Sequence, residues 1–100
     1  MYNYGMDSFE WDEAKNEFNQ EKHGVSFEDA QLAFLDPKRI VALDNGHSTT
    51  HEKRFYCIGK LNGGILTVRF TYRSNTIRII GAGFWRKGKR VYEKENSVYG

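Results

Sequence analysis

The stretch that decides the fold is KRFYCIGKLNGGILTVRFTYRSNTIRIIGA, residues 53–82. Apolar and polar side chains alternate through it with a period of two, which is typical of strands that bury one face. Asn62-Gly63 and Ser74-Asn75 interrupt the alternation, and Asn-Gly is a dipeptide that two-residue hairpins favour. The stretch therefore predicts three antiparallel strands joined by two tight turns.

The same alternation predicts the strand register, because a slip by one residue moves every side chain to the opposite face. Two-residue turns place Tyr56 directly opposite Arg69. Thr71 then lies between Arg54 and Arg78. One face collects the apolar side chains of Phe55, Cys57, Leu66, Val68, Phe70, Tyr72, Ile77 and Ile79. The other, called here the polar face, collects Arg54, Tyr56, Lys60, Thr67, Arg69, Thr71, Arg73, Thr76 and Arg78.

The polar face carries four arginines and one lysine, and its strands contribute no carboxylate. Like charges this close repel unless an anion satisfies them. Guanidinium groups match phosphate oxygens with two parallel hydrogen bonds, and Tyr56 adds a ring on which a base can stack. The pattern favours anion binding, and a solvated sheet face is the alternative.

Two helices are expected ahead of the strands. Asp12 is a suitable N-cap and Gly24 a suitable C-terminal residue for a helix over 12–23. Ser26 begins a second helix, which Pro37 stops. The first helix has few apolar positions, so its packing stripe is thin.

The remaining segments complete an α+β fold. Residues 39–43 return to a period of two and predict one more strand, and 89–96 predict a short final helix. Phe9-Glu10-Trp11 is a short apolar entry that is compatible with a strand. We expect two N-terminal helices packed on one face of a four-stranded antiparallel sheet, with a short C-terminal helix.

Composition points to a small domain in a reducing compartment. The chain has 100 residues, 39% hydrophobic and 15% aromatic, which is enough for one core. The single cysteine, Cys57, excludes an intrachain disulfide. Neither a signal-peptide pattern nor a membrane-length apolar run is seen. We expect one cytoplasmic domain over 1–100, with a loose arm at 1–8 and a loose tail at 97–100.

Charge is distributed unevenly along the chain. Residues 1–50 hold four basic and ten acidic side chains, a net of −6, and residues 51–100 hold eleven basic and three acidic ones, a net of +8. A basic half indicates a polyanion or an acidic partner. An internal match, in which acidic helices neutralise basic strands, is the alternative.

The histidines and the cysteine are further candidates for chemistry. His23 closes the first helix, where it can act as a general acid or base or stabilise the helix terminus. His47 and His51 flank a polar stretch, but no helix brings them together, so a surface loop is favoured over a metal site. Cys57 falls on the apolar face and is expected to be inert. We expect no metal and no cofactor.

Taken in order, these features resemble the BrnT toxin family. The residues that carry the resemblance are Phe9-Glu10-Trp11-Asp12, Lys15, Asn19, Lys22-His23-Gly24-Val25-Ser26-Phe27-Glu28-Asp29-Ala30, Phe34, Asp36-Pro37, Glu52, Arg54, Gly59, Ile77-Arg78-Ile79-Ile80 and Tyr92-Glu93. They span about residues 9–95. One departure is that the family often reads Ile-Ser-Ala-Arg where this chain has Ile80-Gly81-Ala82-Gly83, so an arginine that contacts RNA is absent.

The resemblance implies a RelE-like fold and an endoribonuclease that halts translation. It also implies a cognate antitoxin with a ribbon-helix-helix part, through which alone the toxin meets operator DNA. The alternative is a non-catalytic module of the same fold that binds the antitoxin or a nucleic acid.

Cleavage without a metal would use the substrate's own 2′-OH as nucleophile, a base to take its proton and cations to stabilise the phosphorane. The expected catalytic residues are His23, Glu52, Arg69 and Arg78. The expected RNA-binding residues are Lys22, Arg54, Tyr56, Arg73, Arg86 and Lys87.

Overall fold

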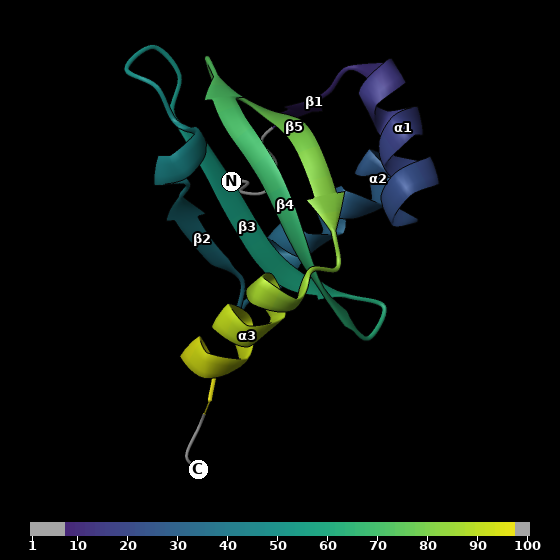
Figure 1. Ribbon diagram of the computed structural model, residues 1–100, viewed down its shortest axis with the longest axis vertical. Helices are drawn as coiled ribbons and strands as arrows, with labels where there is room; N and C mark the ends of the chain where they lie inside the picture. Colours follow the sequence, from purple (N-terminus) through teal and green to yellow (C-terminus); the bar gives the residue numbers. More distant parts are fainter. Residues whose placement is uncertain (1–7, 98–100) are drawn as a thin grey trace.

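The computed structural model describes residues 8–97, which form an α+β fold (Figure 1). The strands are β1 (Ser8–Glu10), β2 (Ile40–Leu43), β3 (Arg54–Leu61), β4 (Gly64–Arg73) and β5 (Thr76–Gly83). The helices are α1 (Glu13–His23), α2 (Phe27–Ala30) and α3 (Arg86–Glu95), with 3₁₀ segments η2 (Gln31–Leu35) and η3 (Asn45–His47). The expectations for residues 1–7 and 98–100 lie outside the described residues.

The sheet has five strands in the order β1-β5-β4-β3-β2 and is mixed. The prediction of four antiparallel strands was wrong in this respect, because β1 runs parallel to β5 and places Glu10 beside Arg78. A strand of three residues is too short to show an alternating pattern. The fifth strand brings a carboxylate to a sheet face whose other strands supply none.

The predicted register is confirmed at the first hairpin, where Tyr56 pairs with Arg69. Asn62 and Gly63 both have positive φ, 50° and 86°, as the tight turn requires. The second hairpin follows the prediction only as far as Phe70. Arg69 then pairs with Gly81, so Ile80 is left as the extra residue of a β-bulge.

Helix α1 begins and ends where the sequence predicts. The Asp12 carboxylate accepts a hydrogen bond from the backbone N–H of Ala14 at 2.8 Å, and Gly24 closes the helix with φ of 72°. Two buried asparagines compensate for the thin apolar stripe. Asn19 donates to the carbonyls of Val25 and Ala82 and accepts from the Ala82 N–H, which fastens α1 to β5.

The second predicted helix is only partly α-helical. It has four α-helical residues and then continues as η2. The 3₁₀ segment lies directly on the bare backbone of Gly59, where a Cβ atom would be 2.3 Å from the Ala33 carbonyl oxygen. The close approach explains why β3 carries a glycine at this point.

The apolar face forms the core, as predicted. Phe27 of α2 packs in it with the fully buried sheet residues Cys57, Leu66, Val68, Phe70 and Ile79. Tyr72, assigned to the same face, is half exposed. No helix among residues 8–97 is long and apolar enough to cross a membrane.

Helix α3 lies on the opposite side of the sheet, which the sequence did not predict (Figure 1). It begins at Arg86 and crosses the polar face, where Gly88 packs against Thr67. Near its C-terminal end the Tyr92 hydroxyl donates to Asp36 Oδ2 at 2.5 Å. Helix α3 therefore covers part of the polar face and leaves a space between itself and strands β3 and β4.

Candidate functional site

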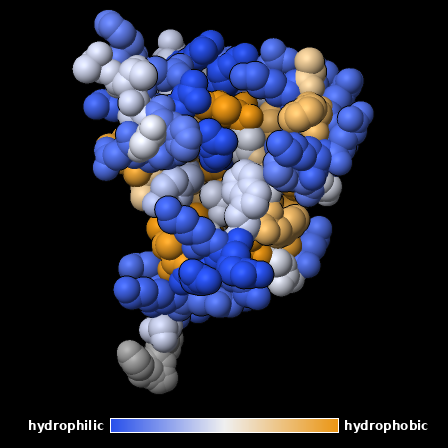
Figure 2. All heavy atoms as spheres, viewed as in Figure 1, coloured by the Kyte–Doolittle hydropathy of each residue, from blue (hydrophilic) through white to orange (hydrophobic). Residues whose placement is uncertain are grey.

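A cleft of about 470 Å³ opens on the polar face between α3, strands β3 and β4, and the loop from β2 to β3. Figure 2 shows this side of the molecule as mostly hydrophilic, with apolar surface visible between the charged side chains. The cleft is lined by Asp44, His47, Tyr56, Ile58, Thr67, Arg69, Trp85, Lys87, Gly88 and Val91.

The sheet and α3 contribute different groups to this cleft. Tyr56 and Arg69 are cross-strand neighbours on β3 and β4, so the phenol and the guanidinium share the sheet side. The first turn of α3 supplies Lys87, and Trp85, the residue just before the helix, supplies an indole. The cleft thus combines two cations with two aromatic rings, a combination suited to phosphate and base together.

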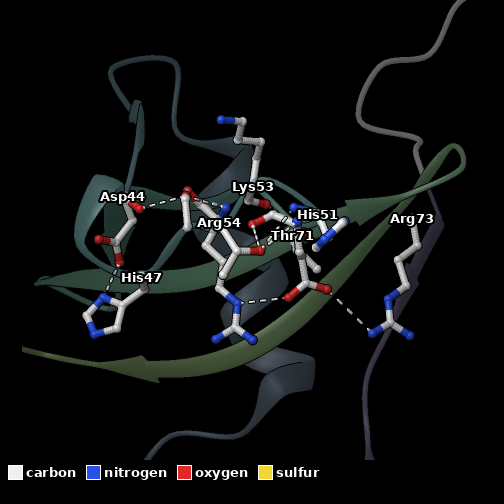
Figure 3. Close-up of polar contacts among 10 residues, drawn as sticks. Asp44, His47, His51, Lys53, Arg54, Thr71 and Arg73 are labelled. Atoms are coloured by element: carbon white, nitrogen blue, oxygen red, sulfur yellow. Dashed lines mark hydrogen bonds and ion pairs between the residues drawn. The ribbon is translucent and has the colours of Figure 1, made fainter.

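Two of the predicted arginines are neutralised by one carboxylate. Glu52 accepts a hydrogen bond from Arg54 Nε at 3.0 Å and forms an ion pair with Arg73 Nη2 at 3.6 Å (Figure 3). The hydrogen bond from Arg54, followed by the positive charges of both arginines, holds the pKa of Glu52 below its usual range. Glu52 is therefore ionised at neutral pH and has no proton to give.

Arg78 has a carboxylate partner as well, whereas Arg69 has none among the described residues. Arg78 Nη1 donates to Glu10 Oε2 at 3.1 Å, at the edge of the sheet where β1 joins β5. Among residues 8–97, Arg69 forms no ion pair and no hydrogen bond with another side chain. It is thus the only arginine of the polar face whose charge no described carboxylate shares, and it lies in the cleft.

The cleft also contains a pair of residues that the sequence analysis did not select. His47 Nδ1 lies 2.8 Å from Asp44 Oδ2, and both residues line the cleft. Figure 3 shows this pair on one side of Arg54 and His51 on the other. The structure pairs β2 with β3, which brings the intervening loop to the end of the sheet near Tyr56, and the sequence predicted the strand at 39–43 but not this position of the loop.

His51 belongs to a different surface, with Glu52 and Arg73. The two loop histidines therefore do not converge. Residues 8–97 contain no group of three or more His, Cys, Asp or Glu side chains placed to hold a metal ion.

His23 and Lys22, predicted from the end of α1, are not among the residues lining the cleft. His23 packs edge-on against Trp85, with ring centroids 5.2 Å apart. Lys22 Nζ lies 5.6 Å from the centre of the Phe18 ring on the same helix. His23 thus reaches the site only through the indole.

Arg86 and Lys87, predicted together, fall on different surfaces. Lys87 lines the cleft, whereas Arg86 lines a second cavity of about 790 Å³ with Lys60 and Lys89. Trp85 borders both. The second cavity is also basic, and it continues the positive surface beyond the indole.

Gly83 lies beneath Trp85. A Cβ atom at this position would be 2.5 Å from Trp85 Cε2, so the indole occupies the space that a side chain would need. Where the family often has an arginine, this chain has a glycine that leaves room for the indole of Trp85.

The structure is thus that of a small α+β protein whose cleft, covered by a helix, has the positive charge that suits an anionic ligand. Comparison with known families identifies it further. Residues 11–88 match the family described as the ribonuclease toxin BrnT of type II toxin–antitoxin systems. The chain belongs to this family of ribonuclease toxins, whose partner is an antitoxin. A comparison with curated proteins found no match.

Proposed function

We propose that this toxin cuts RNA in the cleft under α3, with Arg69 binding the phosphate that is cleaved. The observation that carries the proposal is that Arg69 lies in the cleft without a carboxylate partner among the described residues. An uncompensated guanidinium can give its full charge and its paired N–H groups to a phosphate. Lys87 adds a second positive charge across the cleft.

Cleavage in this proposal needs no metal ion. The 2′-oxygen attacks the neighbouring phosphorus, and Arg69 and Lys87 stabilise the charge that develops on the phosphorane. Trp85 holds a flanking base by stacking, whereas Tyr56, the cross-strand neighbour of Arg69, contacts the RNA at the cleaved phosphate. Arg54, Arg73 and Arg78 contact the RNA backbone outside the cleft, where their carboxylate partners lower their contribution.

The partners follow from the family and the charge. We propose an RNA substrate, a cytoplasmic location and a RelE-like relationship for the fold. The cognate antitoxin is of ribbon-helix-helix type, covers the cleft, and connects the toxin to operator DNA. The positive cleft favours an acidic segment of that antitoxin.

The test is cleavage of total RNA by purified protein in excess EDTA, with and without ribosomes. Arg69→Ala is expected to lower the rate by about 100-fold or more, the usual loss when one donor to a developing oxyanion is removed. Arg78→Ala is expected to lower it far less. Arg90→Ala, on the exposed part of α3, is the matched control for loss of one positive charge.

Two results would contradict the proposal. Cleavage by Arg69→Ala at the parent rate would exclude the cleft as the phosphate site. Absence of cleavage by the parent under both conditions would favour the non-catalytic binding module.

A further inference from the structure

We infer that His47 is a catalytic residue of this ribonuclease, the base that takes the proton of the 2′-OH, and that Asp44 is its positioning residue. The inference rests on the proposed cleft and adds to it the group that moves the proton. It follows from the geometry of the loop between β2 and β3. From the sequence alone, this loop was predicted to be a polar surface loop without a site.

The hydrogen bond between the two side chains defines the state of the imidazole. Asp44 Oδ2 lies 2.8 Å from His47 Nδ1, and the Asp44 side chain is 18% exposed whereas that of His47 is 59% exposed. An ionised carboxylate can only accept a hydrogen bond, so Nδ1 must carry the hydrogen. The lone pair of a neutral imidazole is then on Nε2, the nitrogen that Asp44 leaves free to accept a proton.

Backbone contacts hold this pair in place. The Asp44 N–H donates to the Arg54 carbonyl at 2.7 Å, and the Ser48 hydroxyl donates to the Asp44 carbonyl at 2.7 Å. The Arg54 N–H in turn donates to the Ser48 hydroxyl oxygen at 2.8 Å. The loop is therefore tied to the first residue of β3, two residues before Tyr56, which fixes the imidazole relative to the sheet side of the cleft.

The charges that line the cleft suit this role. Arg69 and Lys87 are its cations, and Asp44 is its only carboxylate among the described residues. The cations attract the phosphate, while Asp44 stabilises the imidazolium that forms when His47 accepts a proton. Two tasks are thus performed by different parts of the cleft. Arg69 on the sheet and Lys87 on the helix stabilise the phosphate charge, and His47 on the loop removes the proton.

Nε2 of His47 takes the 2′-OH proton, and the 2′-oxygen forms a bond to phosphorus. The bond from phosphorus to the 5′-oxygen then breaks with its electron pair, and the 5′-oxygen takes a proton from the Tyr56 hydroxyl. The products are a 2′,3′-cyclic phosphate and a 5′-OH, and water returns the proton from His47 to Tyr56.

The experiment measures RNA cleavage by His47→Ala and His47→Gln, with Arg69→Ala alongside. Both histidine variants are expected to lose about 100-fold or more in rate, within the usual range for a general base. Added imidazole is expected to restore part of the activity of His47→Ala. Because His47 is exposed, both histidine variants should keep the parent melting temperature. His51→Ala is the matched control, since this second loop histidine lies on another surface.

Asp44→Asn tests the positioning role, with kcat expected to fall about tenfold or more while KM stays unchanged. A change in KM with kcat unchanged would overturn that role. Cleavage by either histidine variant within about threefold of the parent, or no recovery of His47→Ala in imidazole, would overturn the catalytic role of His47. If Arg69→Ala also kept full activity, the cleft itself would be excluded. If Arg69→Ala lost activity while the histidine variants kept it, only the catalytic role of His47 would be excluded.

Discussion

Replacement of Gly88 by alanine is expected to destabilise the protein, although alanine is the better helix former. An alanine Cβ at this position would lie 2.0 Å from Thr67 Oγ1 and 3.4 Å from Thr67 Cβ. The hydroxyl cannot easily turn away, because a β-branched side chain in a strand is restricted in χ1. Helix α3 must therefore lift from the sheet by more than an ångström.

The magnitude follows from two opposed effects. Alanine gains about 1 kcal/mol over glycine within a helix, whereas forcing an extra methyl group into a packed contact costs about 1–3 kcal/mol. The net loss for Gly88→Ala is then up to about 2 kcal/mol, equivalent to roughly 8–16 °C in melting temperature at the upper end for a domain of this size.

A second variant makes this reasoning refutable. Thr67→Ala removes a hydroxyl that is buried and has no hydrogen-bond partner among the described residues, so its polar cost is small. In the double variant the two Cβ atoms would be 3.4 Å apart, an ordinary contact. Urea unfolding of all four proteins is expected to give a favourable coupling of about 1 kcal/mol or more. Additive effects of the two substitutions, or a Gly88→Ala variant more stable than the parent, would refute the clash.

Further predictions concern the groups that hold α3 and the core. Tyr92→Phe is expected to lower the free energy of unfolding by about 1–3 kcal/mol in a urea titration, because the charged carboxylate of Asp36 loses a hydrogen bond. Burial, and then the hydrogen bond to Asp36, raise the pKa of Tyr92 from 10.0 to about 12, so its contribution is complete below pH 10 and should vanish as the pH rises through 12. An unchanged urea midpoint between pH 10 and 12 would argue against this. Gly83→Ala should displace Trp85 and shift its fluorescence, and an unaltered spectrum would mean that the indole has room to spare. Burial raises the pKa of Cys57 to about 12, so the native protein should not react with a thiol reagent at pH 8, and rapid labelling would contradict the buried position.

The sequence was a good guide wherever a pattern was long enough to repeat. Strand β4 alternates without a break from Leu66 to Arg73 and β3 does so from Arg54 to Cys57, so their register and their apolar face could be predicted, with Tyr56 opposite Arg69. The bulge at Ile80 could not be predicted, because Ile79 and Ile80 are both apolar and either could face the core. Strand β1 was not predicted as part of the sheet, because its three residues are too few to show an alternation of apolar and polar side chains.

The site was harder to predict than the fold, because it depends on how separate segments meet. Arg69 and Tyr56 could be placed together from one hairpin. The partnership of Glu10 with Arg78 required a parallel strand from the other end of the chain. Asp44 and His47 required the position of a loop, for which sequence periodicity carries no information.

The bulge has a consequence for how chain length can vary in this protein. Ile80 is the residue without a partner, and the pairs on either side of it are Phe70 with Ile79 and Arg69 with Gly81. Deletion of Ile80 would leave both pairs in register, so a shorter chain could close the ladder evenly. A deletion within the unbulged hairpin of β3 and β4 would instead reverse the faces of everything beyond it. The loss of one residue is therefore admissible at one place in β5, directly across from Arg69, where it would change the local twist and the direction of that side chain.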